Sequence, residues 1–138
     1  IGFNFKFTEL QACIGIEQMK KLPGRVTRMK EILERYKSNL ANENNLTFFK
    51  QDLDSTTPWF IDTLAERRDG LIDYLKKNNI GSRPMYPPIN KQKAYDLSGN
   101  YPVSNNIGRN GLWLPSSSQL SNSHIDLICD IIKDYYKN

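Results

Sequence analysis

The sequence predicts an α+β fold: a small, mostly antiparallel sheet with helices packed on one face, preceded by a long helix. The chain has 138 residues, which is enough for one compact domain with a sizeable core. Its hydrophobic content of 38% and charged content of 25% are ordinary for a globular protein. The expected strands are separated by too little chain for a large parallel sheet, so one sheet layered against helices is the natural arrangement.

The first helix is expected to begin at Thr8. The threonine hydroxyl can accept a hydrogen bond from the backbone of Gln11, and the Gln11 side chain can reach back to Thr8, which forms a capping box. Small and apolar residues then recur at a spacing of three or four and predict one buried face. They are Ala12, Cys13, Ile16, Met19 and Leu22.

Pro23 and Gly24 interrupt this helical pattern. Proline removes a backbone donor and clashes with the preceding turn, so the sequence predicts a break or a kink here. The pattern resumes over residues 26–40, where apolar positions repeat on one face and charged residues fill the opposite face.

Short strands and one helix are expected in the middle of the chain. Residues 46–49 and 59–64 are short apolar and aromatic runs that predict two strands. A helix is expected at residues 67–78, and it ends at the Asn and Gly typical of a helix C-terminus. A third strand is expected at residues 82–86, where two prolines end it.

The last third of the chain is expected to hold a loop, a short helix, an extended piece and a final helix. The loop covers residues 89–101, the short helix residues 103–110, and the extended piece residues 112–115. Ser121 is expected to cap the final helix. The inner face of that helix is predicted from the spacing of Ile125, Ile128, Ile131, Ile132 and Tyr135.

Composition argues against several classes of function. The net charge of +4 is spread along the chain, so we interpret it as a solvated surface, with no nucleic-acid partner expected. No stretch approaches the roughly 20 apolar residues of a membrane span, and neither a signal peptide nor a metal-ligand spacing is visible. Cys13 and Cys129 are interpreted as buried free thiols of a cytoplasmic protein, and His124 as a surface residue.

Two segments carry unusual chemistry. In residues 2–7, aromatic residues alternate with Asn4 and Lys6, so an extended segment would present an amide and an ammonium group on one face, suited to a phosphate. An edge strand with a solvated face explains the pattern equally well. Residues 81–95 combine basic side chains, tyrosines and rigid prolines, which suits recognition of a flat ring and phosphates. A crossover loop whose tyrosines pack on the core is the alternative.

Three segments resemble motifs of the DegT/StrS-type nucleotide-sugar aminotransferases. Residues 2–12, GFNFKFTELQA, are similar to a family motif of Gly, aromatic, Asn, aromatic and Arg or Lys that ends in Gln-Ala. Residues 83–95, RPMYPPINKQKAY, resemble the family's Arg, aromatic, Pro-Pro segment. Residues 112–115, LWLP, followed by residues 120–121, LS, are similar to a late element of the family. The three occur in the family's order and together cover nearly the whole chain.

The resemblance implies a fold type I enzyme that uses pyridoxal 5′-phosphate (PLP) and works as a cytoplasmic homodimer. Family members transfer an amino group, usually from glutamate, to a keto sugar carried by a nucleoside diphosphate. In the family, the Schiff-base lysine lies upstream of the first motif, so it is expected before residue 1. The resemblance, the absence of an initial Met and the aromatic first residues together favour a C-terminal part of a longer enzyme, inactive by itself.

The family's site residues carry over to five positions. Asn4 is expected to reach the PLP phosphate of the neighbouring subunit, and Lys6 to lie near phosphate or nucleotide groups. Arg83, Tyr86 and Asn90 are expected to contact the sugar nucleotide, although many members have histidine at the position of Asn90. No catalytic residue and no metal ligand is expected in this chain itself.

The resemblance also implies a division of the chain and leaves one rival function open. Residues 1–24 correspond to the end of the large domain and the dimer-interface motif and helix, and residues 25–138 to the C-terminal small domain of the enzyme. The nucleotide sugar and a second subunit are the expected partners, with no membrane contact. The rival is a stand-alone, non-catalytic binding or regulatory domain derived from such an enzyme.

Overall fold

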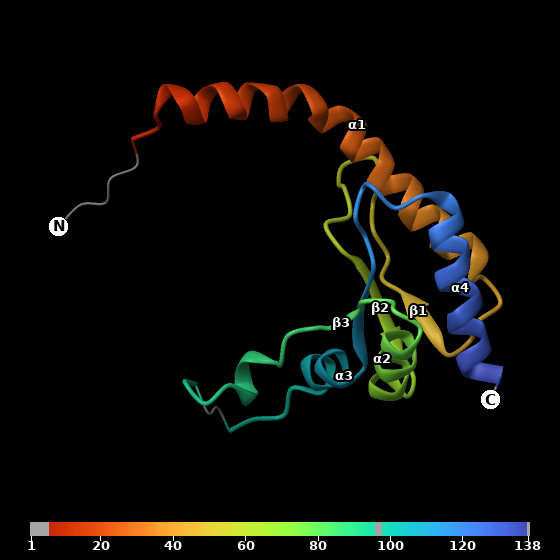
Figure 1. Cartoon of the computed structure of the whole chain (residues 1–138). Coiled ribbons are helices and arrows are strands. Elements are labelled where there is room, and N and C mark those ends of the chain that lie inside the picture. Colours follow the sequence, from red (N-terminus) through yellow and green to blue (C-terminus); the bar gives the residue numbers. More distant parts are fainter. Residues whose placement is uncertain (1–5, 96–97, 138) are drawn as a thin grey trace.

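The computed structural model describes residues 6–95 and 98–137 and has the expected α+β architecture (Figure 1). Four strands form one antiparallel sheet in the order β1-β2-β4-β3. The strands are β1 Leu46–Phe48, β2 Ile61–Ala65, β3 Arg83–Pro84 and β4 Gly111–Leu114. The helices are α1 Glu9–Asn39, α2 Arg68–Lys77, α3 Pro102–Asn110 and α4 Asn122–Lys137, with a 3-10 turn, η1, at Ile89–Lys91.

Helix α1 is continuous, so the first of the two outcomes expected at Pro23, a break, is wrong. The capping box at its start is confirmed: the backbone of Gln11 donates to the Thr8 hydroxyl at 3.3 Å, and the backbone of Thr8 donates to the Gln11 side chain at 2.9 Å. Figure 1 shows the helix changing direction along its length. The hydroxyl of Thr27 donates to the carbonyl oxygen of Pro23 at 3.2 Å. Because Pro23 has no backbone N–H and Thr27 bonds back to the preceding turn, the helix is expected to bend here without ending.

The helical face predicted to be buried in the first half of α1 is exposed in this chain. Ile16 is 57% exposed and Met19 is 64% exposed, and Cys13 is also exposed, so the expectation of two buried thiols is wrong for Cys13. The spacing of these residues is that of a packed face, but no other element of the described residues covers it. The second half of the same helix does pack, with Leu33 and Tyr36 fully buried.

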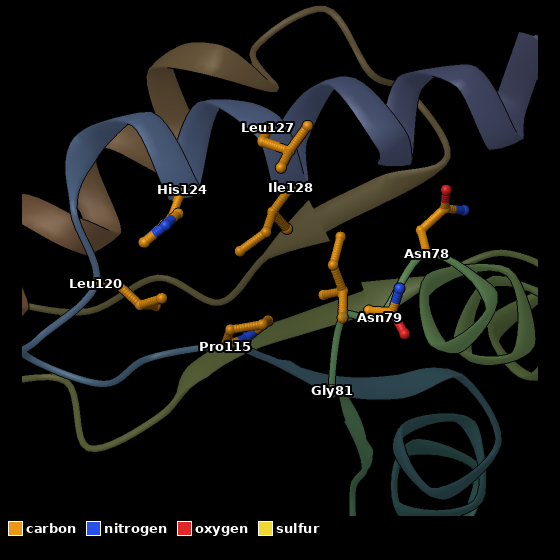
Figure 2. Close-up of a pocket in the computed structure, with 9 residues that line it drawn as sticks. Asn78, Asn79, Gly81, Pro115, Leu120, His124, Leu127 and Ile128 are labelled. Atoms are coloured by element: carbon orange, nitrogen blue, oxygen red, sulfur yellow. The ribbon is translucent and has the colours of Figure 1, made fainter.

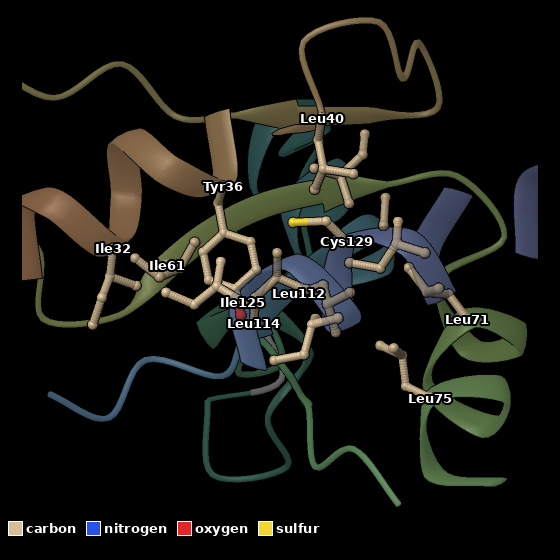
Figure 3. Packing of buried hydrophobic residues seen from close by; sticks show 14 of the residues in the cluster. Ile32, Tyr36, Leu40, Ile61, Leu71, Leu75, Leu112, Leu114, Ile125 and Cys129 are labelled. Atoms are coloured by element: carbon tan, nitrogen blue, oxygen red, sulfur yellow. The ribbon is translucent and has the colours of Figure 1, made fainter. Parts of the chain in front are cut away.

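The core lies between the sheet and helices α1, α2 and α4 (Figure 3). Along β2, Ile61, Thr63 and Ala65 are buried, and along β4 Leu112 and Leu114 are buried. Because side chains alternate along a strand, all of these project from the same face of the sheet. The core side of the helices is formed mainly by Ile32, Leu33, Tyr36, Leu71, Leu75, Ile125, Cys129 and Ile132.

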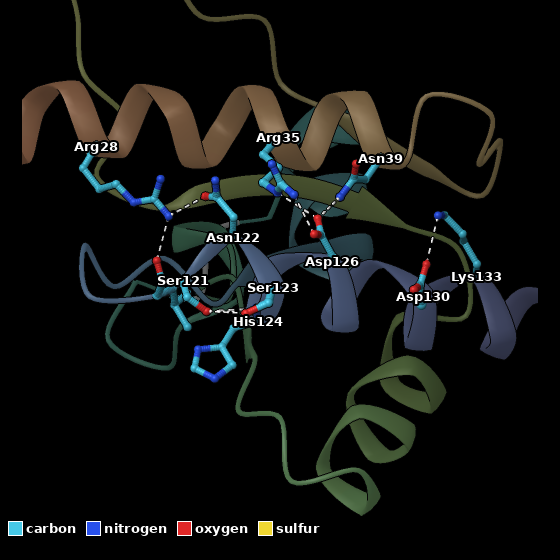
Figure 4. Close-up of polar contacts among 11 residues, drawn as sticks. Arg28, Arg35, Asn39, Ser121, Asn122, Ser123, His124, Asp126, Asp130 and Lys133 are labelled. Carbon is cyan, nitrogen blue, oxygen red and sulfur yellow. Dashed lines mark hydrogen bonds and ion pairs between the residues drawn. The ribbon is translucent and has the colours of Figure 1, made fainter.

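A polar seam fixes α1 against α4 beside this core (Figure 4). The guanidinium of Arg35 donates two hydrogen bonds to the carboxylate of Asp126, at 2.8 and 2.6 Å, and the side chain of Asn39 donates a third at 2.7 Å. Arg28 donates to the carbonyl oxygen of Leu120 at 2.7 Å. The expected cap of α4 is also present, since the backbone of His124 donates to the hydroxyl of Ser121 at 3.2 Å.

Two strands of the sheet differ from the expectation. The third strand is shorter than residues 82–86, because Pro84 has no N–H to continue the ladder, although the backbone of Met85 still donates to the carbonyl of Gly111 at 3.0 Å. The extended piece expected at residues 112–115 is a central strand of the sheet, paired with β2 on one side and β3 on the other.

Candidate functional site

The face of the sheet away from the core gathers polar and aromatic side chains at one place. Trp113 pairs with Asp62 across β4 and β2, and with Arg83 across β4 and β3. Residues paired across neighbouring strands project from the same side. Since Leu112 and Leu114 point into the core, Trp113 and its two cross-strand partners lie on the opposite face.

Trp113 is the centre of this cluster. Its indole N–H donates to the Asp62 carboxylate at 2.7 Å, and its ring stacks on Phe60 with centroids 4.4 Å apart and an interplanar angle of 19°. Tyr86 meets the indole edge-on, with centroids 5.0 Å apart. The guanidinium carbon of Arg83 lies 5.3 Å from the Tyr86 ring centroid and 5.8 Å from that of Trp113. We call these residues, Phe60, Asp62, Arg83, Tyr86 and Trp113, the aromatic platform.

The carboxylate of Asp62 is the partly buried charged group of the platform. Loss of hydration raises the pKa of Asp62 above its ordinary value, and the hydrogen bond from Trp113 acts in the opposite direction. The side chain of Gln51 donates to the second carboxylate oxygen at 3.2 Å. Both oxygens therefore have partners, which is what a half-buried charge requires.

The structure brings two of the expected substrate residues together and separates the others. Arg83 and Tyr86 are neighbours, and the Tyr86 ring is 62% exposed. Asn90 is instead 7% exposed and its amide donates to Asn105 at 3.4 Å, so it anchors the turn to α3. Lys6 precedes the α1 cap at the far end of that helix from the sheet, and Asn4 lies outside the described residues.

A hollow lies elsewhere, beside helix α4 (Figure 2). It has a volume of about 390 Å³ and lies between the turn after α2 and helix α4. Its wall is mostly apolar, with Leu120, Leu127 and Ile128 on one side, and His124 at the exposed start of α4 contributes a ring. None of the residues expected to bind substrate lines it, so the platform is the better candidate site.

Comparison with known proteins decides the family. The model of the DegT/DnrJ/EryC1/StrS aminotransferase family matches residues 1–133. The chain belongs to this family. It is 29% identical over 142 residues to the GDP-perosamine synthase of Escherichia coli O157:H7, covering 100% of this chain and 39% of that protein. It is 30% identical over 132 residues to the dTDP-4-amino-4,6-dideoxy-D-glucose transaminase of Escherichia coli, covering 87% of this chain and 36% of that protein.

The fold agrees with the family as well. The chain superposes on a DegT DnrJ EryC1 StrS aminotransferase from Brucella abortus with a TM-score of 0.87 and 26% identity, over 100% of this chain and 38% of that one. The chain therefore spans less than two fifths of the length of these relatives. The fold class, including the small domain of a fold type I aminotransferase, is confirmed.

The residue expected near phosphate groups, Lys6, lies just before the cap of helix α1. Lys6 carries an ammonium group of the kind that binds phosphate, beside the N-terminus of α1, where the helix dipole favours an anion. Within residues 6–95 and 98–137, no group of three or more His, Cys, Asp or Glu could hold a metal ion. Over the same residues, no helix is long and apolar enough to cross a membrane.

Sequence reasoning missed Phe60, Asp62 and Trp113. Trp113 stands between two leucines, and that alternation indicates a strand residue facing away from the core. A large aromatic residue facing away from a core is a signal of a surface with a role. The partnership with Asp62 depends on strand pairing between β2 and β4, which the sequence pattern does not specify.

Proposed function

We propose that this chain is the C-terminal part of a PLP-dependent aminotransferase that aminates a nucleotide-linked keto sugar, most simply a 4-keto sugar. Glutamate would give up its amino group and become 2-oxoglutarate, while the sugar ketone becomes an amine. PLP, when bound, carries the amino group between the two. The observation that supports this proposal most is the family match over residues 1–133, together with relatives named for GDP- and dTDP-linked sugars.

The chain's own part in the reaction is proposed to be substrate binding by the small domain. Arg83 supplies a fixed positive charge for the diphosphate, and the exposed ring of Tyr86 supplies a flat surface beside it. Asn90 is proposed to contribute to the substrate site indirectly, because its amide holds η1 against α3. The covalent link to PLP is assigned to a lysine upstream of residue 1, so the chain alone is proposed to be inactive.

Residues 1–24 are proposed to belong to the large domain and the dimer interface, and residues 25–138 to the small domain. The exposed apolar positions of the first half of α1 support an interface with a second subunit, because such a patch is unfavourable in water. An α-helix rises 1.5 Å per residue, so roughly 35 Å of helix separates Glu9 from Ile32. Asn4 and Lys6 are thus proposed to serve the PLP phosphate of the neighbouring subunit.

The first test is made on the native polypeptide that carries this chain. Its intact mass is compared with the 16.0 kDa of these residues, and it is incubated with PLP, glutamate and GDP- or dTDP-linked 4-keto sugars. Mass spectrometry is expected to detect the amino sugar and 2-oxoglutarate. The 138-residue chain alone serves as the control and is expected to give no absorption band of lysine-bound PLP.

Three results would contradict the proposal. A lysine-bound PLP band in the isolated chain would show that the Schiff-base lysine is not upstream. A native mass equal to that of this chain, with no amination, would favour the rival function, a stand-alone binding or regulatory domain. Nucleotide binding without amination would point the same way.

A further inference from the structure

Trp113 occupies the middle of the aromatic platform without offering its polar edge. Its indole N–H is donated to Asp62 at 2.7 Å, and one ring face is covered by Phe60 at 4.4 Å. The groups that remain accessible beside it are the Tyr86 ring, 62% exposed, and the Arg83 side chain, which is also exposed. The indole therefore lies behind the surface that a ligand would meet.

Trp113 touches both accessible groups at once. The Tyr86 ring meets it nearly perpendicularly, at 84° and 5.0 Å, and the guanidinium carbon of Arg83 lies 5.8 Å from its centroid. Tyr86 and Arg83 also contact each other at 5.3 Å. A perpendicular ring contact and a cation over a ring face are both favourable geometries, so the indole limits the orientations of both side chains.

We propose that Trp113 is a positioning residue, held by Asp62 and Phe60, that orients Tyr86 and Arg83 for the nucleoside diphosphate part of the substrate. The inference rests on the proposed function for the identity of the ligand, and it adds three residues to the site. Tyr86 stacks on the base and Arg83 pairs with the phosphates. Trp113 itself contacts neither the base nor the phosphates, and it acts through Tyr86 and Arg83.

The physical gain is preorganisation. Arginine and tyrosine lose side-chain freedom when they bind a ligand, and that loss weakens binding. The loss is smaller where their orientations are already restricted in the free protein. Two fixed side chains account for about a tenfold gain in affinity. Asp62 and Phe60 complete the arrangement, because a tryptophan that could itself rotate would orient nothing.

A role of Trp113 in hydrophobic packing alone agrees less well with the structure. Trp113 projects from the face opposite the core, and it is only half-buried, whereas its neighbours Leu112 and Leu114 are 0% and 2% exposed. Its ring contacts run to Phe60, Tyr86 and Arg83, which all belong to the open face. Packing alone would require neither the hydrogen bond to Asp62 nor the cation beside the ring.

The test is a double-mutant cycle on the native polypeptide that carries this chain, with GDP and dTDP as calorimetric probes. Tyr86→Leu and Trp113→Leu are each expected to weaken binding of the better probe about tenfold. The double variant is expected to lose clearly less than the sum of the two single losses, since part of the effect of Trp113 is exerted through Tyr86 and the rest through Arg83. Trp59→Leu is the matched control: Trp59 is 82% exposed, contacts Phe60 at the edge of the platform, and is expected to leave affinity unchanged.

Additive losses, about a hundredfold in the double variant, would overturn the positioning role, and so would unchanged affinity in Trp113→Leu. If Trp113→Leu does not fold, Trp113→Phe takes its place, because it keeps a ring but loses the donor to Asp62. It is expected to weaken binding about threefold, and wild-type affinity there would equally overturn the inference. Asp62→Asn keeps an acceptor for the indole and is therefore expected to weaken binding less than Trp113→Leu does.

Steady-state amination by the same variants separates this inference from the proposed function. Trp113→Leu is expected to raise KM for the nucleotide sugar about tenfold while kcat falls less than about twofold, a split that general misfolding would not give. If the wild type aminates but the variants bind and react like it, the inference fails and the function stands. If GDP or dTDP binds in a Trp113-dependent way without amination, the function fails and the inference stands.

Discussion

The two halves of α1 have the same helical pattern and opposite environments. In the second half, Ile32 and Tyr36 are 0% exposed and pack between the sheet and α4. In the first half, Leu10 is 74% exposed and Met19 is 64% exposed. Both halves show apolar residues at a spacing of three or four. The periodicity identifies which face would pack, and only the presence of a partner surface decides whether it does.

The second half also carries the polar contacts that specify its position. Arg35 and Asn39 both donate to Asp126 of α4, and Arg28 reaches the loop before that helix. The first half has an ion pair within its own turns, that of Lys20 with Glu17 at 2.5 Å. Ion pairs within one helix stabilise that helix slightly but do not fix its position relative to other elements. The first half of α1 is therefore held by the chain's own helical bonds.

The largest expected effect comes from removing matched apolar side chains from the two halves. Leu33→Ala, in the core, is expected to lower the free energy of unfolding by about 2–5 kcal/mol, because it leaves a cavity. Ile16→Ala, on the exposed face, is expected to change it by less than about 0.5 kcal/mol. Urea unfolding of the 138-residue chain, followed by tryptophan fluorescence, measures both.

A comparable loss in both variants would contradict the difference between the halves. It would mean that the first half is covered in solution, as it would be by a second copy of the chain. Repeating the unfolding at several protein concentrations identifies that case, since the stability of an associated chain depends on concentration.

The two cysteines report on the same comparison through their reactivity. Cys13 is exposed in the first half of α1, whereas Cys129 of α4 is buried in the core, and burial raises the pKa of Cys129 to about 11. Because the thiolate is the reactive species, we expect Cys13 to react with a disulfide reagent at pH 8 at least about a hundredfold faster than Cys129. Absorbance of the released thiol follows both phases.

Cys13→Ser provides the control for this experiment. It is expected to remove the fast phase and leave the slow one, whereas a remaining fast phase would show that Cys129 is accessible. In the native polypeptide, slow labelling of Cys13 would show that the first half of α1 lies in an interface. Rapid labelling there would argue against the proposed dimer contact.

Much of the fold could be predicted because its signals are local. The capping box at Thr8, the cap at Ser121 and the inner positions Ile125, Ile128 and Ile132 of α4 all follow from residues within one or two helical turns. The continuity of α1 through Pro23 could not be predicted this way. A proline makes helical structure less favourable at its position, and whether a helix continues through it depends on the stability of the turns on both sides.

The site could be predicted only where its residues lie close together in the sequence. Arg83 and Tyr86 belong to one stiff segment whose composition indicates binding, and the structure places them together. Trp113 and Asp62 are 51 positions apart, and their hydrogen bond depends on the register between β2 and β4. Register is set by the whole sheet, so no local pattern indicates this pair.

A smaller effect is expected from the ion pair between α1 and α4. Hydrogen bonds from Arg35, and then Asn39, hold the pKa of Asp126 below its ordinary value. A lowered pKa in the folded state contributes stability above the unfolded value of about 3.9, and that contribution is lost as the pH falls through the folded pKa. Asp126→Asn is therefore expected to lower Tm by a few degrees at pH 7 and by nothing at low pH.

Thermal unfolding between about pH 7 and pH 2 measures whether the Tm values of Asp126→Asn and the wild type become equal at low pH. The effect stays small because the side chains of Arg35 and Asp126 are 36% and 40% exposed. Asp130→Asn is the matched control on the same helix, since Asp130 pairs only within α4, with Lys133 at 3.2 Å. A Tm difference for Asp126→Asn that persists unchanged to pH 2 would show that the pair does not act through charge.

The smallest effect on global stability is expected from Pro23→Ala, which tests whether the two halves of α1 act as one unit. Proline costs about 3 kcal/mol relative to alanine inside a helix, so the substitution favours helical structure around this position. The described residues of the first half do not belong to the core cluster, so the gain is expected as increased far-UV circular dichroism, with a change below about 0.5 kcal/mol in the free energy of unfolding. If the free energy of unfolding instead rises by about 3 kcal/mol, the whole of α1 unfolds cooperatively with the core, and the distinction between its halves concerns solvent exposure only.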